Sequence, residues 1–232
     1  MVKWRLDSTS SVDNSGRWRD QVNRVDMAEL TKANIEVGLD FLTERDDDLA
    51  KLYRRYGVPP LWSREPGFAT LVQIVLEQQV SLASARAVFT RLNDAVPVLT
   101  PGSFLALGED LKRFGFSRQK ARYCRELAQR VNEGLLDLKS LEQLDDDSVR
   151  TRLTEVRGIG RWTAEIYLLM ALNRPDAWPA GDLAVAKAVQ QIKDLKELPQ
   201  GGELEEISEG WRPWRALAAR LLWQHYLKGM SA

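Results

Sequence analysis

The sequence predicts an all-α fold. From Met27 onward, apolar residues recur at helical spacing. Residues that cap helices, such as Ser81 and Ser117, stand directly before several of these apolar runs. After residue 25 no segment alternates β-branched and polar residues in the way that a strand does. Helices are therefore the only regular elements we expect.

The expected helices follow one another with short breaks. A first periodic stretch runs from Leu30 to Tyr53 and ends at Gly57-Val-Pro-Pro60. Residues 97–102 read as a loop. Further helices are expected over residues 68–78, from 81 to about 95, from 117 to about 131, from 145 into the turn at 158, from 161 to about 172, over 182–192 and over 213–228.

Composition limits the class of protein. A chain of 232 residues with 44% hydrophobic content can bury a core as one or two helical domains. No apolar run reaches membrane-spanning length, and the N-terminus lacks the apolar stretch of a signal peptide. The single cysteine, Cys124, excludes an intrachain disulfide. Residues 1–25 form a polar, serine-rich arm to which we assign no function.

Two glycines, Gly158 and Gly160, mark a tight turn between helices. Both lack a Cβ and both tolerate a positive φ, so a phosphate can approach the backbone N–H groups there. These amides open the next helix, whose N-terminus favours an anion. Arg157 and Arg161 flank the turn and add attraction that depends on salt. A purely structural turn is the competing interpretation.

Four segments together resemble the helix-hairpin-helix DNA glycosylases. Val156-Arg-Gly-Ile-Gly-Arg-Trp-Thr-Ala164 resembles the hairpin, and Pro179-Ala-Gly-Asp182 resembles the loop with the catalytic acid. Leu76-Glu-Gln-Gln-Val-Ser81 resembles the segment that inserts a residue into the DNA stack. The stretch from Trp211 to Trp223 resembles the penultimate helix of the alkylpurine branch, the bacterial 3-methyladenine DNA glycosylase II type. The resemblance covers residues 60–228 in family order.

The resemblance implies a two-lobed helical fold with the active-site cleft between the lobes and without an N-terminal β domain. The central lobe would cover about 70–185, with the hairpin at 153–165, and the second lobe 26–69 plus 186–232. It also implies a monomer that binds damaged double-stranded DNA in the cytoplasm, associated with the nucleoid. The net charge is zero, but basic residues cluster around the hairpin, as a DNA-binding stripe would require. Ordinary solvent-exposed helix faces, some positively and some negatively charged, would explain the same pattern.

Asp182 is the expected catalytic residue. Cleavage of an N-glycosidic bond passes through an oxocarbenium-like state that a carboxylate stabilises. An Asp after Pro-Ala-Gly and before an apolar run is also a good helix N-cap, and the two roles are compatible. Bifunctional relatives carry a lysine where this chain has Trp162, so we expect hydrolysis without strand cleavage. Lys187, one turn past Asp182, is read as a phosphate or salt-bridge partner.

Aromatic residues indicate the substrate. An N-alkylated purine is cationic and favours electron-rich rings once it has left the duplex. We expect the base pocket to contain Trp162, Tyr167, Trp214 and Trp223. The chain departs from the family pattern at Ile166, where a pocket tyrosine is usual. Packing in the core is the alternative explanation for each tryptophan.

The remaining expectations concern DNA contacts and ions. Gln79 matches the residue that fills the gap left in the DNA stack by the flipped base, and Gln78 would hydrogen-bond the opposite base. The alternative interpretation is that the two are simply polar residues at the end of a buried helix. The expected DNA-binding set is Gln78, Gln79, Ser117, Lys120, Arg157, Gly158, Ile159, Gly160, Arg161, Thr163 and Lys187. The resemblance allows a structural Na⁺ or K⁺ on the backbone carbonyls of Thr154, Val156 and Ile159. It implies that no cofactor is required, and that the chain belongs to the branch of the family without an iron–sulfur cluster.

Three functions remain open. The first is a monofunctional glycosylase for alkylated purines of the 3-methyladenine and 7-methylguanine type. The second is a related glycosylase for deaminated or oxidised bases, and the third is a non-catalytic hairpin module that only holds DNA.

Overall fold

The computed structural model describes residues 29–108 and 111–229, and every regular element in these ranges is a helix. The all-α prediction is confirmed. The expected arm over residues 1–25 lies outside the described residues. None of the helices in the described ranges has the length and apolar character needed to cross a membrane.

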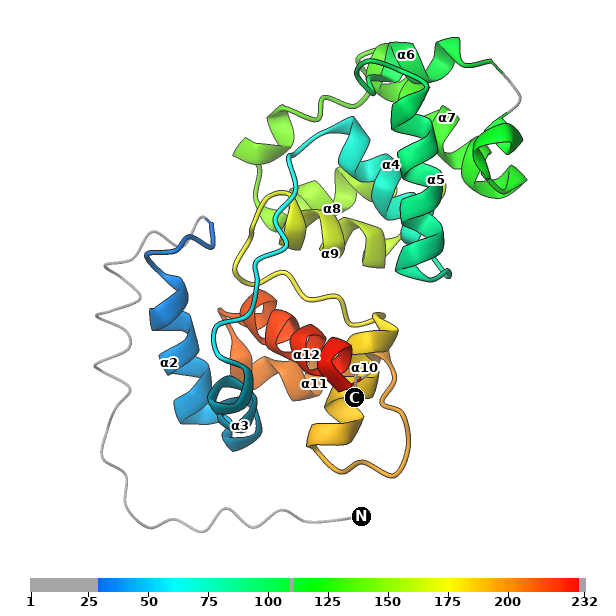
Figure 1. Cartoon of the computed structure of the whole chain (residues 1–232). Helices are drawn as coiled ribbons and strands as arrows, with labels where there is room; N and C mark the ends of the chain where they lie inside the picture. The colour runs from blue at the N-terminus through cyan, green and yellow to red at the C-terminus, as the bar shows by residue number, and fades with distance from the viewer. Residues whose placement is uncertain (1–28, 109–110, 230–232) are drawn as a thin grey trace, which may run out of the picture.

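The helices fall into two groups, which lie one above the other in Figure 1. The first group contains α2 (Ile35–Arg45), α3 (Asp47–Tyr56), α10 (Leu183–Ile192), α11 (Gly201–Ser208) and α12 (Arg215–Gly229). The second contains α4 (Phe68–Glu77), α5 (Leu82–Asp94), α6 (Pro101–Ala106), α7 (Arg118–Asn132), α8 (Asp146–Thr154) and α9 (Arg161–Met170). Short 3₁₀ turns occupy Leu111–Phe114, Ser140–Gln143 and Glu209–Trp211.

Helix α12 is the centre of the first group. It packs against α2, α3 and α10, and ten consecutive residues from Arg215 to Gln224 are buried. A helix that is buried on every side must satisfy its polar groups internally. Arg220 does so with backbone carbonyls of three segments, as described below.

The predicted helix caps are confirmed. The side chains of Ser81, Ser117 and Asp145 each accept a hydrogen bond from the backbone N–H three residues later. Each side chain satisfies one of the N–H groups that the first turn of a helix leaves without a partner. Local sequence therefore determines where α5, α7 and α8 begin.

Two elements differ from the prediction. The loop expected over residues 97–102 ends early, because Thr100 and Ser103 form a reciprocal capping box and Pro101 starts α6. Helix α11 was not expected, since its two leading glycines disfavour a helix. Its start is stabilised by Glu203, whose carboxylate accepts the Gln200 N–H at 2.8 Å.

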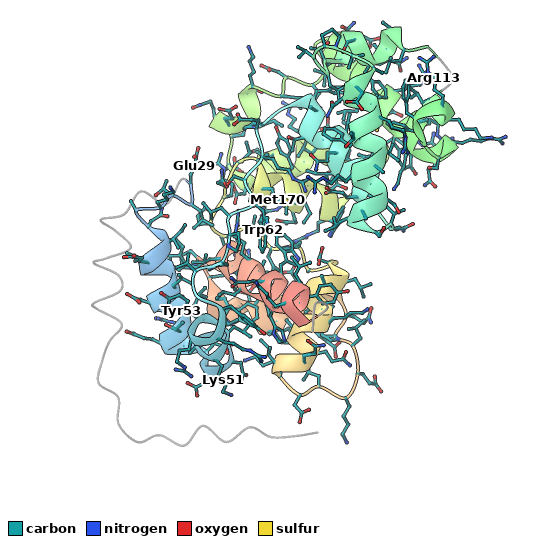
Figure 2. The ribbon with its side chains drawn as sticks, in the orientation of Figure 1. Glu29, Lys51, Tyr53, Trp62, Arg113 and Met170 are labelled. Carbon is teal, nitrogen blue, oxygen red and sulfur yellow. The ribbon has the colours of Figure 1, made fainter. Side chains whose placement is uncertain are left out.

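Two connections join the groups, residues 57–67 between α3 and α4 and residues 171–182 between α9 and α10. Figure 2 labels Trp62 and Met170 at this junction. The N–H of Arg64 donates to the carbonyl of Met170 at 2.8 Å, so the first connection is fastened to the end of α9. The first connection thus has a defined path between the two groups.

Candidate active site and nucleic-acid interface

Asp182 is the N-cap of α10. Its Oδ1 accepts the backbone N–H groups of Ala184 and Val185, both at 3.0 Å. The turn before it is closed by the Asp182 N–H, which donates to the Pro179 carbonyl at 2.8 Å. The Pro/Gly loop and the cap therefore fix the orientation of this carboxylate.

Two indoles from different helices also bind the Asp182 carboxylate. Trp162, on α9, donates from Nε1 to Oδ2 at 3.0 Å. Trp223, on α12, donates from Nε1 to Oδ1 at 3.1 Å. Since α9 and α12 belong to different groups, the carboxylate lies where the two groups meet. Among the described residues, Oδ1 accepts three hydrogen bonds and Oδ2 one, so Oδ2 keeps the lone pair that can face a ligand.

A buried ion pair supports the loop that leads to Asp182. Glu165 is 1% exposed, and its carboxylate accepts from Nε of Arg150 at 2.7 Å and from the Trp178 N–H at 3.1 Å. Burial lowers the pKa of Arg150, but the hydrogen bond and charge of Glu165 outweigh it and raise that pKa overall. Because Glu165 lies one turn after Trp162 on α9, the same helix positions one indole and the loop carrying the acid.

The two hairpin glycines have different conformations. Gly158 has a φ of +90°, and a Cβ there would lie 2.0 Å from the Tyr123 ring. Gly160 is extended, with a φ of −93°, and a Cβ there would meet nothing within 4 Å. Both glycines tolerate a positive φ, but Gly160 does not adopt one. Its small size only leaves the space in front of α9 open.

The N-terminus of α9 is exposed and lies between two arginines. Its N-cap, Gly160, offers no side chain to the first-turn N–H groups, so these donors point outward. Arg157 and Arg161 are both exposed. Nη2 of Arg161 lies 3.3 Å from Oε1 of Glu205, so part of its charge is already paired. Ile159 is 4% exposed, which leaves only its backbone for an outside ligand.

Gln78 connects the turn between α4 and α5 to the hairpin. Its Nε2 donates to the Gly158 carbonyl and to Oγ1 of Thr163, both at 2.9 Å. In this structure Gln78 is therefore a positioning residue of the hairpin, and its amide does not reach outward to a base. Thr163 is 1% exposed, so its predicted place on the DNA-binding surface is also corrected.

Lys120 and Ser117 use their polar groups within the protein. Nζ of Lys120 donates to the carbonyls of Leu76 and Gln78 at 2.6 and 2.7 Å, and burial lowers the pKa of this amine. The Ser117 hydroxyl accepts the Lys120 N–H as a helix cap. Lys120 stabilises the end of α4 and Ser117 the start of α7, which corrects the expected direct contact of both side chains with DNA. Gln79, which follows Gln78, is exposed and has a φ of +55°.

Tyr167 and Trp214 do not face the site. Both are fully buried, and the Tyr167 hydroxyl accepts the Gly67 N–H at 2.9 Å. The ring of Trp214 packs so closely on α2 that a Cβ on Gly38 would lie 2.7 Å from it. A side chain without exposed surface cannot stack on a base in this conformation. These two pocket assignments are therefore corrected to core positions.

Sequence reasoning missed Trp62, on the connection before α4. Its ring centroid lies 6.2 Å from that of Trp223, with an interplanar angle of 72°. The side chain is half-buried and its backbone has a φ of +49°. A large aromatic residue that follows two prolines inside a connection was the available signal.

The structure gives three observations on the remaining predicted residues. Lys187 is exposed, and its Nζ lies 6.0 Å from the ring centroid of Tyr226. Of the carbonyls expected to hold a cation, that of Val156 already accepts the Ile159 N–H at 3.0 Å, which leaves it one lone pair. The Thr154 hydroxyl donates to the Arg150 carbonyl at 2.8 Å. Backbone oxygens are ligands that suit a hard monovalent ion.

Comparison with known proteins gives consistent similarities. Residues 72–213 match the model of the HhH-GPD superfamily of base excision DNA repair proteins. DNA-3-methyladenine glycosylase 1 of Schizosaccharomyces pombe is 32% identical over 202 residues, which cover 84% of this chain and 87% of that protein.

Solved structures agree with this similarity. The S. pombe 3-methyladenine DNA glycosylase in complex with abasic DNA superimposes with a TM-score of 0.77 at 28% identity, over 81% of this chain and 95% of that one. The 3-methyladenine DNA glycosylase of Archaeoglobus fulgidus gives a TM-score of 0.72 at 27% identity, over 91% of this chain and 76% of that one.

Proposed function

The chain belongs to the HhH-GPD superfamily of base excision DNA repair proteins, and on that basis we propose that it excises alkylated purines of the 3-methyladenine and 7-methylguanine type from double-stranded DNA. The observation that carries this proposal is the Asp182 carboxylate held between the indoles of Trp162 and Trp223. The similarity to two 3-methyladenine DNA glycosylases supports it.

Asp182 stabilises the charge that develops on the sugar. As the bond between C1′ and the base nitrogen breaks, its electron pair goes to the base and C1′ becomes cationic. Oδ2, the less occupied oxygen, faces that cation, and the hydrogen bonds of the carboxylate fix it in place before the reaction. Water then adds to C1′ and loses a proton, which leaves the free base and an abasic site.

The surroundings of Asp182 favour a cationic leaving group. In the described ranges, the groups that hydrogen-bond this carboxylate are two indole and two backbone N–H groups, none of which acts as a general acid. An N-alkylated purine leaves as a neutral base and needs no added proton. A neutral deaminated or oxidised base is a poorer leaving group unless it is protonated. This difference favours the alkylated substrate over the alternative lesions.

We propose that the enzyme is monofunctional. Trp162 stands where bifunctional relatives have their lysine, and its indole donates to Asp182. An indole nitrogen is not a nucleophile toward a sugar carbon, so no Schiff base forms there. Lys187 contacts the ring of Tyr226 and serves as a phosphate partner in this proposal.

We propose that the enzyme holds DNA as a monomer, through its backbone. The open N-terminus of α9 binds a phosphate, with Arg157 and Arg161 beside it. A monovalent cation on the carbonyls of Thr154, Val156 and Ile159 would bridge the hairpin and that phosphate. Gln79, exposed on a turn that Lys120 and Gln78 hold rigid, fills the space left by the flipped base.

A panel of duplexes, each with one lesion, tests the function. We expect release of 3-methyladenine and 7-methylguanine, and slower or no release of hypoxanthine, uracil and 8-oxoguanine. Asp182→Asn, purified in the same way, is the control that shows whether a contaminating enzyme releases the bases. Preferred excision of a neutral lesion would instead identify the chain as a glycosylase for deaminated or oxidised bases.

A further inference from the structure

We propose that Trp62 is a specificity-determining residue, which forms a third wall of the pocket for the flipped cationic purine beside Trp162 and Trp223. The inference rests on the proposed function and adds a residue that the hairpin, the loop and α12 do not contain. Trp62 comes from the connection between α3 and α4, over 100 residues before Trp223 in the chain.

The contact between Trp62 and Trp223 places Trp62 at the site. The two rings meet in a T-shaped arrangement with centroids 6.2 Å apart. Trp223 in turn donates from Nε1 to Oδ1 of Asp182 at 3.1 Å. One ring contact and one hydrogen bond therefore connect Trp62 to the carboxylate through Trp223.

Trp62 keeps surface and hydrogen-bonding capacity for a ligand. Its side chain is half-buried, in contrast to Trp214 and Trp178, which are at most 1% exposed. No hydrogen bond of the Trp62 indole is found within residues 29–108 and 111–229. A ring that makes one aromatic contact and leaves its N–H open is better placed to bind a ligand than to fill the core.

The backbone of Trp62 is strained, and its neighbours hold it in place. A φ of +49° is rare for a residue with a large side chain, and such positions cluster at ligand-binding sites. On one side, Nε of Arg220 donates to the Leu61 carbonyl at 2.9 Å. On the other, Oγ of Ser63 donates to Oδ1 of Asn173 at 2.7 Å, and the Arg64 N–H donates to the Met170 carbonyl.

Arg220 is the positioning residue for this wall. It is fully buried, and besides Leu61 it donates to the carbonyls of Leu169, on α9, and Ala216, on α12. Burial lowers the pKa of its guanidinium to about 9. Since Arg220 and Trp223 lie one turn apart on α12, the same helix fixes the backbone before Trp62 and the ring that Trp62 contacts.

The chemistry of three indoles predicts selectivity for charge. The face of an indole attracts a cation more strongly than the face of other aromatic side chains does. A 7-methylguanine base is cationic in DNA and hypoxanthine is neutral, although both are bicyclic purines. Removal of one indole should therefore reduce excision of 7-methylguanine more than excision of hypoxanthine.

The experiment compares Trp62→Leu and Trp62→Phe with the wild-type chain, and uses Val58→Ala as the matched control. Leu keeps apolar volume without a π face, Phe keeps a ring, and Val58 is an exposed residue of the same connection, 51% exposed. Single-turnover excision is measured on duplexes with 7-methylguanine or hypoxanthine, together with Tm and binding to an abasic-site analogue.

We expect Trp62→Leu to lower 7-methylguanine excision by about five- to a hundredfold, the range for loss of one base–aromatic stacking contact. The ratio of 7-methylguanine to hypoxanthine excision should fall, Trp62→Phe should restore most of it, and Val58→Ala should change neither. An unchanged ratio in Trp62→Leu would overturn the inference while the function stands. A wild-type chain that releases no alkylated purine would instead overturn the proposed function and this inference with it.

Discussion

The indole N–H of Trp162 lies 3.0 Å from Oδ2 of Asp182, so the residue at the position of the family's nucleophilic lysine binds the acid instead. An indole donor stabilises the carboxylate as an anion and presents a ring next to it. In the proposed function, Trp162 therefore takes the place of a nucleophile and adds a wall to the base pocket. The predictions below test both consequences.

Borohydride should trap no covalent complex between the wild-type chain and DNA. Trapping requires a Schiff base between an amine and the sugar, and Trp162 supplies no amine. Strands should break only after alkali or heat treatment of the product, measured on a denaturing gel. Trapping that disappears in Lys187→Ala would make Lys187 the nucleophile and the enzyme bifunctional.

Trp162→Ala should cost about 1–3 kcal/mol in excision of a cationic lesion, the range for stacking of one base on one ring. The variant removes the ring and also one of the four hydrogen bonds to the Asp182 carboxylate. Trp162→Phe is the matched control, because it keeps a ring and removes only the N–H. A loss of equal size in both variants would assign the effect to the hydrogen bond rather than to stacking.

Asp182→Asn should abolish excision and leave binding to an abasic-site analogue within about tenfold of wild type, because only stabilisation of the transition state is lost. Asn is as good an N-cap as Asp, so α10 should keep its start and the Tm should change little. Excision in single-turnover assays and binding by anisotropy check the two parts. Excision that stays near the wild-type rate would reduce Asp182 to a helix cap.

Gly158→Ala should weaken binding to every duplex, with or without a lesion, whereas Gly160→Ala should change the fold little. At Gly158 both the positive φ and the contact with Tyr123 oppose a Cβ, whereas at Gly160 the Cβ meets open space. Tm values and binding to an undamaged duplex separate the two variants. Equal destabilisation by both would contradict the conformations described for the hairpin.

Local features could be predicted from the sequence, and contacts between distant segments could not. The caps at Ser81, Ser117 and Asp182 depend on residues within one turn, so their patterns were sufficient. The sequence around Gln78 predicts a DNA contact, because nothing local indicates a bond to Gly158, 80 residues later. The burial of Trp214 and the contact of Trp62 with Trp223 likewise depend on how α2, α12 and the connection pack together.

Glu205→Gln should increase affinity for undamaged DNA and make it more sensitive to salt. Glu205 lies 3.3 Å from Nη2 of Arg161, so it competes with a phosphate for that guanidinium. Without Glu205, Arg161 faces only Glu165, 3.8 Å from its Nε, and can neutralise one more phosphate, which steepens the slope of log K against log salt by about 1. Titrations at several salt concentrations measure this slope. Glu206→Gln, an exposed neighbour on α11, is the matched control.

Glu165→Gln should destabilise the protein and slow excision together. The variant removes the charge that Arg150 faces at 2.7 Å, and truncating one partner of a buried pair costs about 3–5 kcal/mol. The Arg150 side chain is 19% exposed and also pairs with Asp147, so we expect the free energy of unfolding to fall by only about 2–3 kcal/mol. Chemical denaturation measures it, with exposed Glu155→Gln as the control.

The effect on excision follows from the second bond of Glu165. Its Oε2 accepts the Trp178 N–H at 3.1 Å, at the start of the loop that ends in Asp182. A Gln side chain can keep that bond only if its carbonyl oxygen, and not its amide nitrogen, faces Trp178. Excision should therefore fall at temperatures where the variant is still folded, with binding to an abasic-site analogue largely kept. Full activity in the folded variant would show that the pair stabilises the core without positioning the acid.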